Sequence, residues 1–311
     1  MSLTASALTA PMVWLVVLAA AALLYQAAVI AALALAWRNP RVTPGRTPAA
    51  LGLPFEEVRI PTANRRALAG WWIPAGADVR PAVVLVHGWG RNRERMLPYV
   101  GMLHPAGFHL LAFDARHHGA SDRDGHASMR KFSEDVRAAV AYLAARGDVD
   151  AVRIAVLGLS IGGSAAIHAA AHEPRIRAVV TVGSFAHPRE AMLAMGLGHP
   201  LLAPGMPLAM RYAEWRVGAR FDELAPERQV GRIAGRALLV HGEDDRVVPV
   251  GDVERLLRGA AGRAERWRIA GRGHSDPHLE PGFAARVTAF LDAALDLKPG
   301  RRRVESNAGA A

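Results

Sequence analysis

Short runs of apolar residues, separated by segments of helix length, make up most of the chain from residue 82 onward. They are rich in Val, Leu and Ala without strict alternation, and they occupy residues 82–87, 108–113, 152–158, 178–183 and 237–242. Strands covered by helices on both faces show this pattern. Helices are predicted between and after them at residues 131–146, 160–172, 251–259 and 282–295. The repetition predicts an α/β fold, a mostly parallel sheet with helices on both faces.

Two more strands are predicted ahead of this pattern, at residues 55–60 and 67–73, as a hairpin leading into the fold. Residues 39–54 are rich in Pro and Gly and predict an extended linker. The segment of about 185–229 separates two strands by more than one helix needs, which predicts an inserted cap within a domain of residues 55–296. Its methionines and prolines fit either a packed helical hairpin or a lid over an apolar acyl pocket.

The first 37 residues contain no charged side chain, and residues 12–37 are almost entirely apolar. About 20 helical residues cross the roughly 30 Å hydrocarbon layer, so residues 1–38 are predicted to form a transmembrane anchor. Trp14 and Trp37 lie near its ends, where aromatic rings favour the headgroup level. A cleaved signal peptide and a buried core helix are the alternatives, but the run lacks a basic start and has no polar face.

Positive charge follows the apolar run, at Arg38, Arg41, Arg46 and Arg59. This places the domain on the cytoplasmic side of the inner (plasma) membrane, as a single-pass protein. The net charge of +10 and a basic tail at residues 297–311, expected to be disordered, favour an anionic lipid surface as partner. No motif indicates nucleic-acid binding, and the absence of cysteine excludes disulfides and a thiolate zinc site.

Polar residues cluster where predicted strands end, which is where open parallel sheets form their sites. The strand at 152–158 runs into "LSIGG" and a small-residue helix, so Ser160 would stand on a sharp turn as a nucleophile. After the strand at 82–87, "HGWG" would aim the backbone N–H of Trp89 at the same point as that of Ile161. Two such donors form an oxyanion hole. Taken alone, Ser160 could equally cap a helix.

The remaining two groups of a serine triad lie near the C-terminus. "HGEDDRVVP" offers Asp244 and Asp245, either of which could orient an imidazole. His274, in "GRGHSD" after a short strand at 266–269, lies where a general base is needed. His87 and His241 end strands and are expected to bond loop backbone.

Two other groups are given structural roles. The adjacent His117 and His118 could suggest a metal site, but no carboxylate or further histidine stands at a helical ligand spacing beside them. Asp114 and Arg116 are expected to fix the loop beneath the "HGWG" turn.

From about Phe55 to Leu295 the chain resembles the α/β-hydrolases, through "HGWG", "FDARHHGASD", "GLSIGG", "HGEDDRVVP" and "GRGHS". The resemblance implies a triad of Ser160, Asp245 and His274, and its spacing selects Asp245 over Asp244. It is greatest to bacterial serine hydrolases of the esterase, acyl-hydrolase or serine aminopeptidase-like branch, including membrane-anchored members. The family's frequent Arg-Gly-His-Gly is altered at His117, and the three-glycine run of some lipases is absent.

We therefore expect a serine hydrolase that cleaves a carboxylic ester or related acyl bond, without cofactor or metal. Its substrate would be a small-molecule or lipid-like acyl compound whose identity and chain length stay open, as does the oligomeric state. A peptidase or aminopeptidase, or an acyltransferase, on the same triad is the alternative among enzymes. A non-catalytic scaffold at the membrane is the alternative from another class.

Overall fold

The computed structural model describes residues 10–297, without the side chains of residues 195 and 196. The predicted basic tail therefore lies outside the described residues except for Leu297, as do the first nine residues of the predicted anchor. The chain divides into two compact units. One unit combines the N-terminal segment up to Arg38 with Met192–Gly218, and the other contains Asn39–Ala191 and everything from Ala219 onward.

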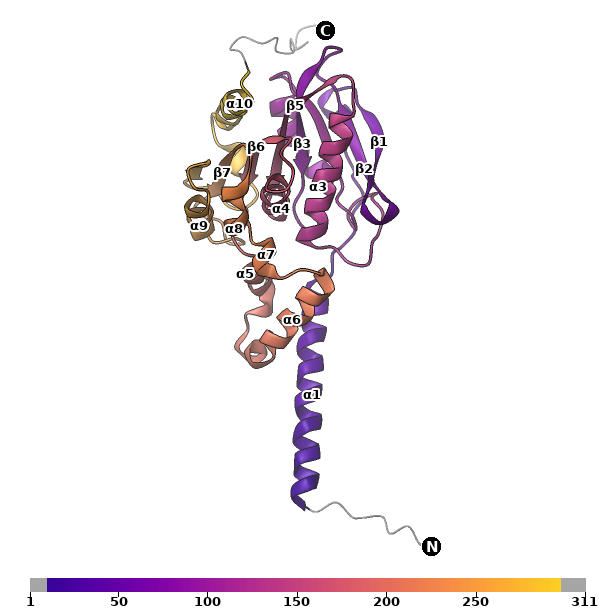
Figure 1. Cartoon of the computed structure of the whole chain (residues 1–311), viewed down its shortest axis with the longest axis vertical. Helices are drawn as coiled ribbons and strands as arrows, with labels where there is room; N and C mark the ends of the chain where they lie inside the picture. The colour runs from indigo at the N-terminus through magenta and orange to yellow at the C-terminus, as the bar shows by residue number, and fades with distance from the viewer. Residues whose placement is uncertain (1–9, 298–311) are drawn as a thin grey trace. The chain divides into compact units, whose positions relative to one another are not determined.

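The larger unit is built on an eight-stranded sheet in the order β1-β2-β4-β3-β5-β6-β7-β8 (Figure 1). β2 pairs antiparallel with β1 and β4, and all other neighbours pair in parallel. Every predicted strand is present. The strands are β1 Glu56–Thr62, β2 Arg66–Ile73, β3 Arg80–Val86, β4 His109–Phe113, β5 Val149–Leu159, β6 Ile176–Val182, β7 Arg236–Gly242 and β8 Ala264–Ile269.

Helices cover both faces of this sheet, because the central strands are apolar on both sides. α3 and α4 lie side by side over one face (Figure 1). α2 and α10 pack together in the core cluster on the other face. The helices of this unit are α2 Leu97–Leu103, α3 Met129–Ala144, α4 Ile161–Ala170, α7 Phe221–Leu224, α8 Pro226–Gln229, α9 Gly251–Gly259 and α10 Phe283–Ala294. The predicted fold class, a mostly parallel sheet with helices on both faces, is confirmed.

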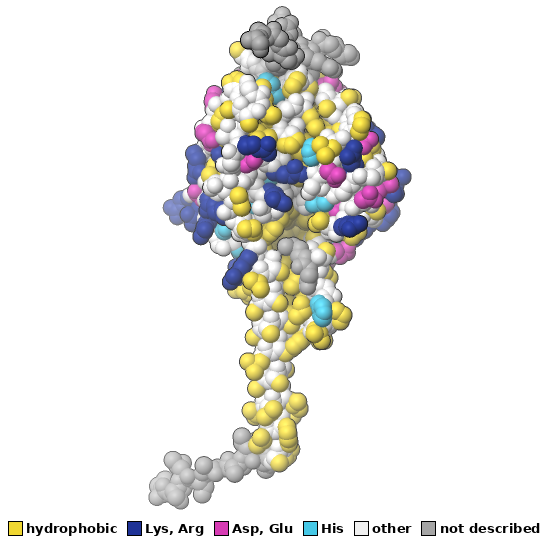
Figure 2. Space-filling model, turned by 180° about the vertical axis from the view of Figure 1, so that it is seen from behind, with side chains coloured by type: hydrophobic (Ala, Val, Ile, Leu, Met, Phe, Trp, Pro, Cys, Tyr) yellow, Lys and Arg dark blue, Asp and Glu magenta, His cyan; other side chains and the backbone are white. Residues whose placement is uncertain are grey.

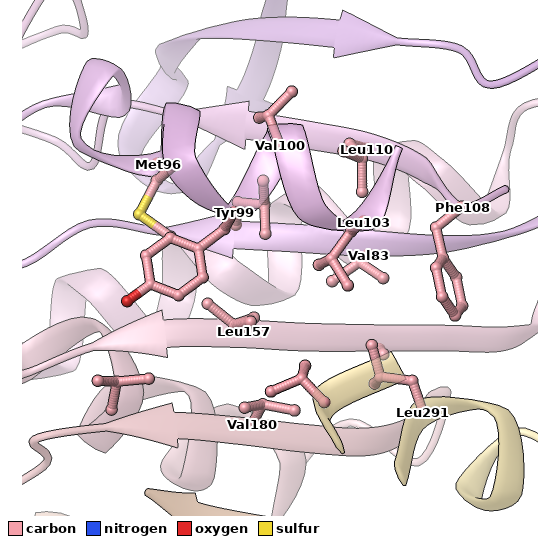
Figure 3. Packing of buried hydrophobic residues seen from close by; sticks show 14 of the residues in the cluster. Val83, Met96, Tyr99, Val100, Leu103, Phe108, Leu110, Leu157, Val180 and Leu291 are labelled. Carbon is pink, nitrogen blue, oxygen red and sulfur yellow. The ribbon is translucent and has the colours of Figure 1, made fainter. Parts of the chain in front are cut away.

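One core cluster shows how the layers pack. Alternate residues of the central strands, among them Val83, Leu157 and Val180, point toward α2 and α10 (Figure 3). Tyr99 of α2 and Leu291 of α10 are almost fully buried against this layer. This packing fixes the strand ends relative to one another.

The predicted linker follows an extended path apart from a short 3-10 turn at Pro48–Leu51, and it is bound to the domain. Arg41 donates from Nε to the carbonyl oxygen of Gly119 at 2.6 Å, and its guanidinium also contacts the carbonyl of Ser121. The amide of Asn39 donates to the carbonyl oxygen of His117 at 2.9 Å. Residues 39–46 therefore form a strap across the loop that follows β4.

The smaller unit pairs a long helix with part of the predicted cap. α1 (Ala10–Ala36) is the one described helix long and apolar enough to cross a membrane, and most of it is exposed. The cap elements of this unit are the π-helical turn η4 Leu193–Leu197, the 3-10 segment η5 Pro200–Gly205 and α6 Met206–Val217, entered through α5 Pro188–Met192. Tyr25 and Gln26 of α1 bond to the backbone of η5.

Candidate active site

Ser160 occupies the turn between β5 and α4 in a conformation that L residues rarely adopt, with φ 52° and ψ −124°. The turn is crowded on both sides. A Cβ on Gly162 would stand 2.5 Å from the carbonyl oxygen of His87, and one on Gly163 would stand 2.1 Å from Ser184 Oγ. Strained non-glycine residues cost about 1–3 kcal/mol and occur preferentially at functional sites. The strain makes Ser160 a candidate functional residue.

The turn after β3 lies beside this serine. A Cβ on Gly88 would stand 3.5 Å from the Cβ of Ser160. The backbone N–H groups of Trp89 and Ile161 make no hydrogen bond with any residue of the described chain. Free donors at a helix N-terminus and on an adjacent turn are suited to bind an anionic oxygen.

Asp245 and His274 come from the loops after β7 and β8, and they are joined by a hydrogen bond of 2.7 Å between Asp245 Oδ2 and His274 Nδ1. The other carboxylate oxygen, Oδ1, accepts from the backbone N–H groups of Val247 at 2.8 Å and Val248 at 2.9 Å. Burial alone would raise the pKa of Asp245. Hydrogen bonds from His241, His274 and Val248 outweigh it and hold this pKa well below its usual range. The carboxylate is therefore charged at neutral pH.

Asp244, the alternative acid, has a different environment. It is exposed, and its backbone N–H donates to the carbonyl oxygen of Arg272 at 2.9 Å. The hydrogen bond to His274 is thus made by the residue that the family spacing selects.

The end of β6 lies between Ser160 and the Asp245–His274 pair. The N–H of Ser160 donates to the carbonyl oxygen of Val182 at 2.8 Å. A Cβ on Gly183 would stand 3.0 Å from His274 Nδ1 and 3.3 Å from Asp245 Oδ2. No hydrogen bond joins the side chains of Ser160 and His274 within residues 10–297. Such bonds often tighten only in the complex with substrate.

Comparison with known proteins identifies the fold that carries these residues. Residues 77–226 match the family model described as serine aminopeptidase, S33. The esterase Pf2001 of Pyrococcus furiosus has a similar structure, with a TM-score of 0.68 and 24% identity over 83% of this chain and all of that one. The chain has the α/β-hydrolase fold. A puromycin-hydrolyzing peptidase of Mycobacterium tuberculosis shares this fold, with a TM-score of 0.63 and 20% identity over 80% of this chain and 40% of that one.

Among curated sequences, the chain is similar to the uncharacterized protein Rv2307c of Mycobacterium tuberculosis. The two are 28% identical over 227 residues, which cover 73% of this chain and 74% of the relative.

Two buried histidines hold the turn after β3. His87 Nε2 accepts the N–H of Ala115 at 3.0 Å, and its Nδ1 donates to the carbonyl oxygen of Gly88 at 2.7 Å. His118 Nε2 accepts the N–H of Gly90 at 3.2 Å. Burial lowers the pKa of His87 to about 4 and that of His118 to about 3. Both are therefore neutral, and each accepts a backbone hydrogen bond that a protonated imidazole could not accept.

The neighbouring charged residues Asp114 and Arg116 hold the loop after β4. Asp114 is fully buried and accepts from the backbone N–H of Arg93 at 2.7 Å and of Ala120 at 2.8 Å. Arg116 pairs with Asp135 at 2.7 Å and with two further carboxylates, so its guanidinium is engaged in structure. His117 takes the left-handed backbone conformation, φ 71°, at the position where the family often has glycine.

Sequence reasoning missed two features of this site. It did not consider the end of β6, although Gly183 and Ser184 lie there, and Ser184 Oγ donates to the carbonyl oxygen of Ser160 at 3.2 Å. A Gly-Ser pair directly after a buried strand was the available signal. It also gave His241 only a contact with loop backbone. His241 Nε2 does lie 3.0 Å from the carbonyl oxygen of Val248, but it also lies 3.2 Å from Asp245 Oδ2.

Proposed function

We propose that this α/β-hydrolase cleaves a carboxylic ester or related acyl bond through an acyl-enzyme on Ser160. The observation that carries the proposal is the hydrogen bond of 2.7 Å between Asp245 and His274. Gly183 lies against this pair, next to the strained turn that holds Ser160. His274 Nδ1 faces the carboxylate, which leaves Nε2 to take the Ser160 proton. Ser160 Oγ then attacks the acyl carbonyl, and the protonated His274 donates to the leaving group.

The charge of Asp245 supports this division of labour. A carboxylate that stays ionised orients the imidazole and stabilises the imidazolium formed during attack. Four donors surround it, so it would remain an acceptor throughout the cycle. We assign the oxyanion to the backbone N–H groups of Trp89 and Ile161, and one such donor contributes about 2.7–4 kcal/mol to the transition state. Water then attacks the acyl-enzyme, with His274 acting as base.

A fluorophosphonate probe tests the nucleophile directly in membranes that contain the full chain. We expect labelling of the wild type and none of Ser160→Ala. Ser164→Ala is the matched control, because Ser164 lies one turn further along α4 and its hydroxyl is occupied by the carbonyl oxygen of Phe185 at 3.1 Å. Equal labelling of wild type and Ser160→Ala would remove Ser160 from the mechanism. If the folded wild type is not labelled at all, the scaffold alternative stands.

A peptidase is the second candidate, supported by the match to the serine aminopeptidase family. A panel of p-nitrophenyl esters of increasing acyl length, run beside an aminoacyl p-nitroanilide, separates the two. We expect Ser160-dependent ester hydrolysis to exceed amide hydrolysis. The reverse order would assign the enzyme to peptide substrates.

We propose further that α1 spans the inner membrane, with the hydrolase domain on the cytoplasmic side. The support is its 27-residue length, its exposed apolar side chains and the arginines that follow it. Alkaline carbonate extraction should leave the full chain in the membrane pellet. Release into the supernatant would contradict a spanning helix.

A further inference from the structure

The contacts between α1 and the cap explain two polar residues in the middle of an apolar helix. Tyr25 Oη donates to the carbonyl oxygen of Leu201 at 2.8 Å and accepts the N–H of Gly205 at 3.3 Å. Gln26 Nε2 donates to the carbonyl oxygen of Gly205 at 3.2 Å. Both side chains thus bond to backbone groups of the 3-10 segment η5.

The backbones of the two segments approach closely at Gly205. A Cβ there would stand 2.9 Å from Val29 Cγ2 and 3.0 Å from Gln26 Oε1. Val29 is fully buried, although most of α1 is exposed. Small residues permit such approach between segments packed in lipid. The cap is therefore fitted to the side of this helix.

The level of this contact along α1 places it at membrane depth. Tyr25 precedes Trp37 by twelve residues, which is about 18 Å of helix. With Trp37 at the headgroup level, η5 reaches the interior of a hydrocarbon layer about 30 Å thick. α6 also has 12 residues, so it is long enough to return from that depth to the surface.

The composition of the cap fits such a position. Residues 191–210 contain no Asp, Glu, Lys or Arg, and the first charge after them is Arg211 in α6. Leu201 is 74% exposed, close to the 73% of Leu24 on α1, and Leu208 is 57% exposed. Figure 2 shows hydrophobic side chains along α1. Irregular backbone is tolerated at membrane depth only where protein groups satisfy it, and Tyr25 and Gln26 supply those groups.

We propose that residues 192–210 of the cap are themselves embedded in the bilayer, packed on α1, with Leu201 and Leu208 in contact with lipid acyl chains. This inference rests on the proposed membrane span of α1. It extends the membrane partner from one helix to the cap that interrupts the hydrolase domain.

The chain contains no cysteine, so single cysteines can be introduced without background. Leu201→Cys and Leu208→Cys in the full chain, labelled with the fluorophore NBD, would be reconstituted into phosphatidylcholine and phosphatidylglycerol vesicles. Quenching would be measured with lipids that carry a doxyl group at acyl carbon 5 or 12, and with aqueous iodide. Leu24→Cys on α1 and Val152→Cys, which is 72% exposed on the domain, are the two controls.

We expect doxyl lipids to quench the probes at 201 and 208 as strongly as the probe at 24, and iodide to quench only the probe at 152. Iodide quenching at 201 and 208 would overturn the proposal while leaving the anchor intact. Protection from both quenchers would assign this surface to a second copy of the chain, which also overturns it. Failure of doxyl quenching at 24 would contradict the spanning helix itself.

A second variant tests the role of the polar pair. Tyr25→Phe combined with Gln26→Leu keeps α1 apolar but removes both sets of hydrogen bonds to η5. We expect the probes at 201 and 208 to lose doxyl quenching and gain iodide quenching in this background, while the probe at 24 is unchanged. Unchanged quenching at 201 and 208 would show that Tyr25 and Gln26 do not hold the cap in lipid.

Discussion

Acid should destabilise this protein through the two buried histidines that hold the turn after β3. Burial lowers the pKa of His87 to about 4 and that of His118 to about 3, whereas an unfolded chain has histidine pKa values near 6.5. The unfolded chain therefore binds protons that the folded chain excludes. The stability that these groups contribute is complete above pH 6.5 and is lost as the pH falls toward the folded values.

The loss of stability is set by how far the pH lies below the pKa of histidine in the unfolded chain. At pH 5, about 1.5 units below the ordinary pKa, each histidine lowers the free energy of unfolding by about 2 kcal/mol, since one unit corresponds to about 1.4 kcal/mol. His118→Gln removes one of the two groups. Its side-chain oxygen can still accept the N–H of Gly90, which donates to His118 at 3.2 Å in the wild type.

The assay is urea unfolding of the full chain in detergent at pH 7 and pH 5, with the fraction folded read by pulse proteolysis. His118→Gln should be less stable than wild type at pH 7, by about 1–3 kcal/mol for the lost bond and packing. Its further loss between pH 7 and pH 5 should be about 2 kcal/mol smaller than that of wild type. The contributions of other titrating groups to the free energy of unfolding cancel when the pH-dependent losses of variant and wild type are subtracted. His172→Gln, at an exposed position, is the control. Equal pH dependence in wild type and His118→Gln would refute the reasoning.

Three further predictions concern the site and the strap. Asp245→Asn should lower kcat for ester hydrolysis by about 10⁴-fold, because it removes the carboxylate that orients His274. Asp244→Asn, at the exposed neighbour, should retain the wild-type kcat. Equal losses of kcat in the two variants would reject the assignment of Asp245. Gly163→Ala should lower the free energy of unfolding by about 1–3 kcal/mol or more, because the alanine Cβ would stand 2.7 Å from the carbonyl oxygen of Gly158. A variant that unfolds at the same urea concentration as the wild type would contradict the tight turn. Arg41→Ala should lower stability by about 1–3 kcal/mol and speed proteolytic cleavage within residues 39–46, and unchanged cleavage would show that the strap is not held by this residue.

The sheet could be predicted because its signal is local. Apolar runs such as that of β3 can be buried on both faces only between helices, so their order along the chain already indicates the architecture. α2 was missed because it has only seven residues, with Pro98 near its start and Gly101 inside it, and no helical period is visible over that length.

Local sequence patterns could not predict contacts between residues that are far apart in the sequence. The Pro and Gly content of residues 39–54 predicts an extended path, but nothing local predicts that Arg41 bonds to the loop after β4. In the same way, adjacent Asp244 and Asp245 are equivalent by chemistry. The family spacing separates them, and the structure gives the physical difference. In the loop after β7, Asp244 is exposed, whereas hydrogen-bond donors surround the carboxylate of Asp245.

The bonds between α1 and the cap also impose an order on biosynthesis. Tyr25 and Leu201 are 176 positions apart, and Gly205 follows Tyr25 by 180. At about 5–20 residues per second, the ribosome makes the cap roughly 9–36 s after its partner on α1. α1 is therefore complete before residues 191–210, which contain no Asp, Glu, Lys or Arg, are made, so its contact surface already exists when they emerge.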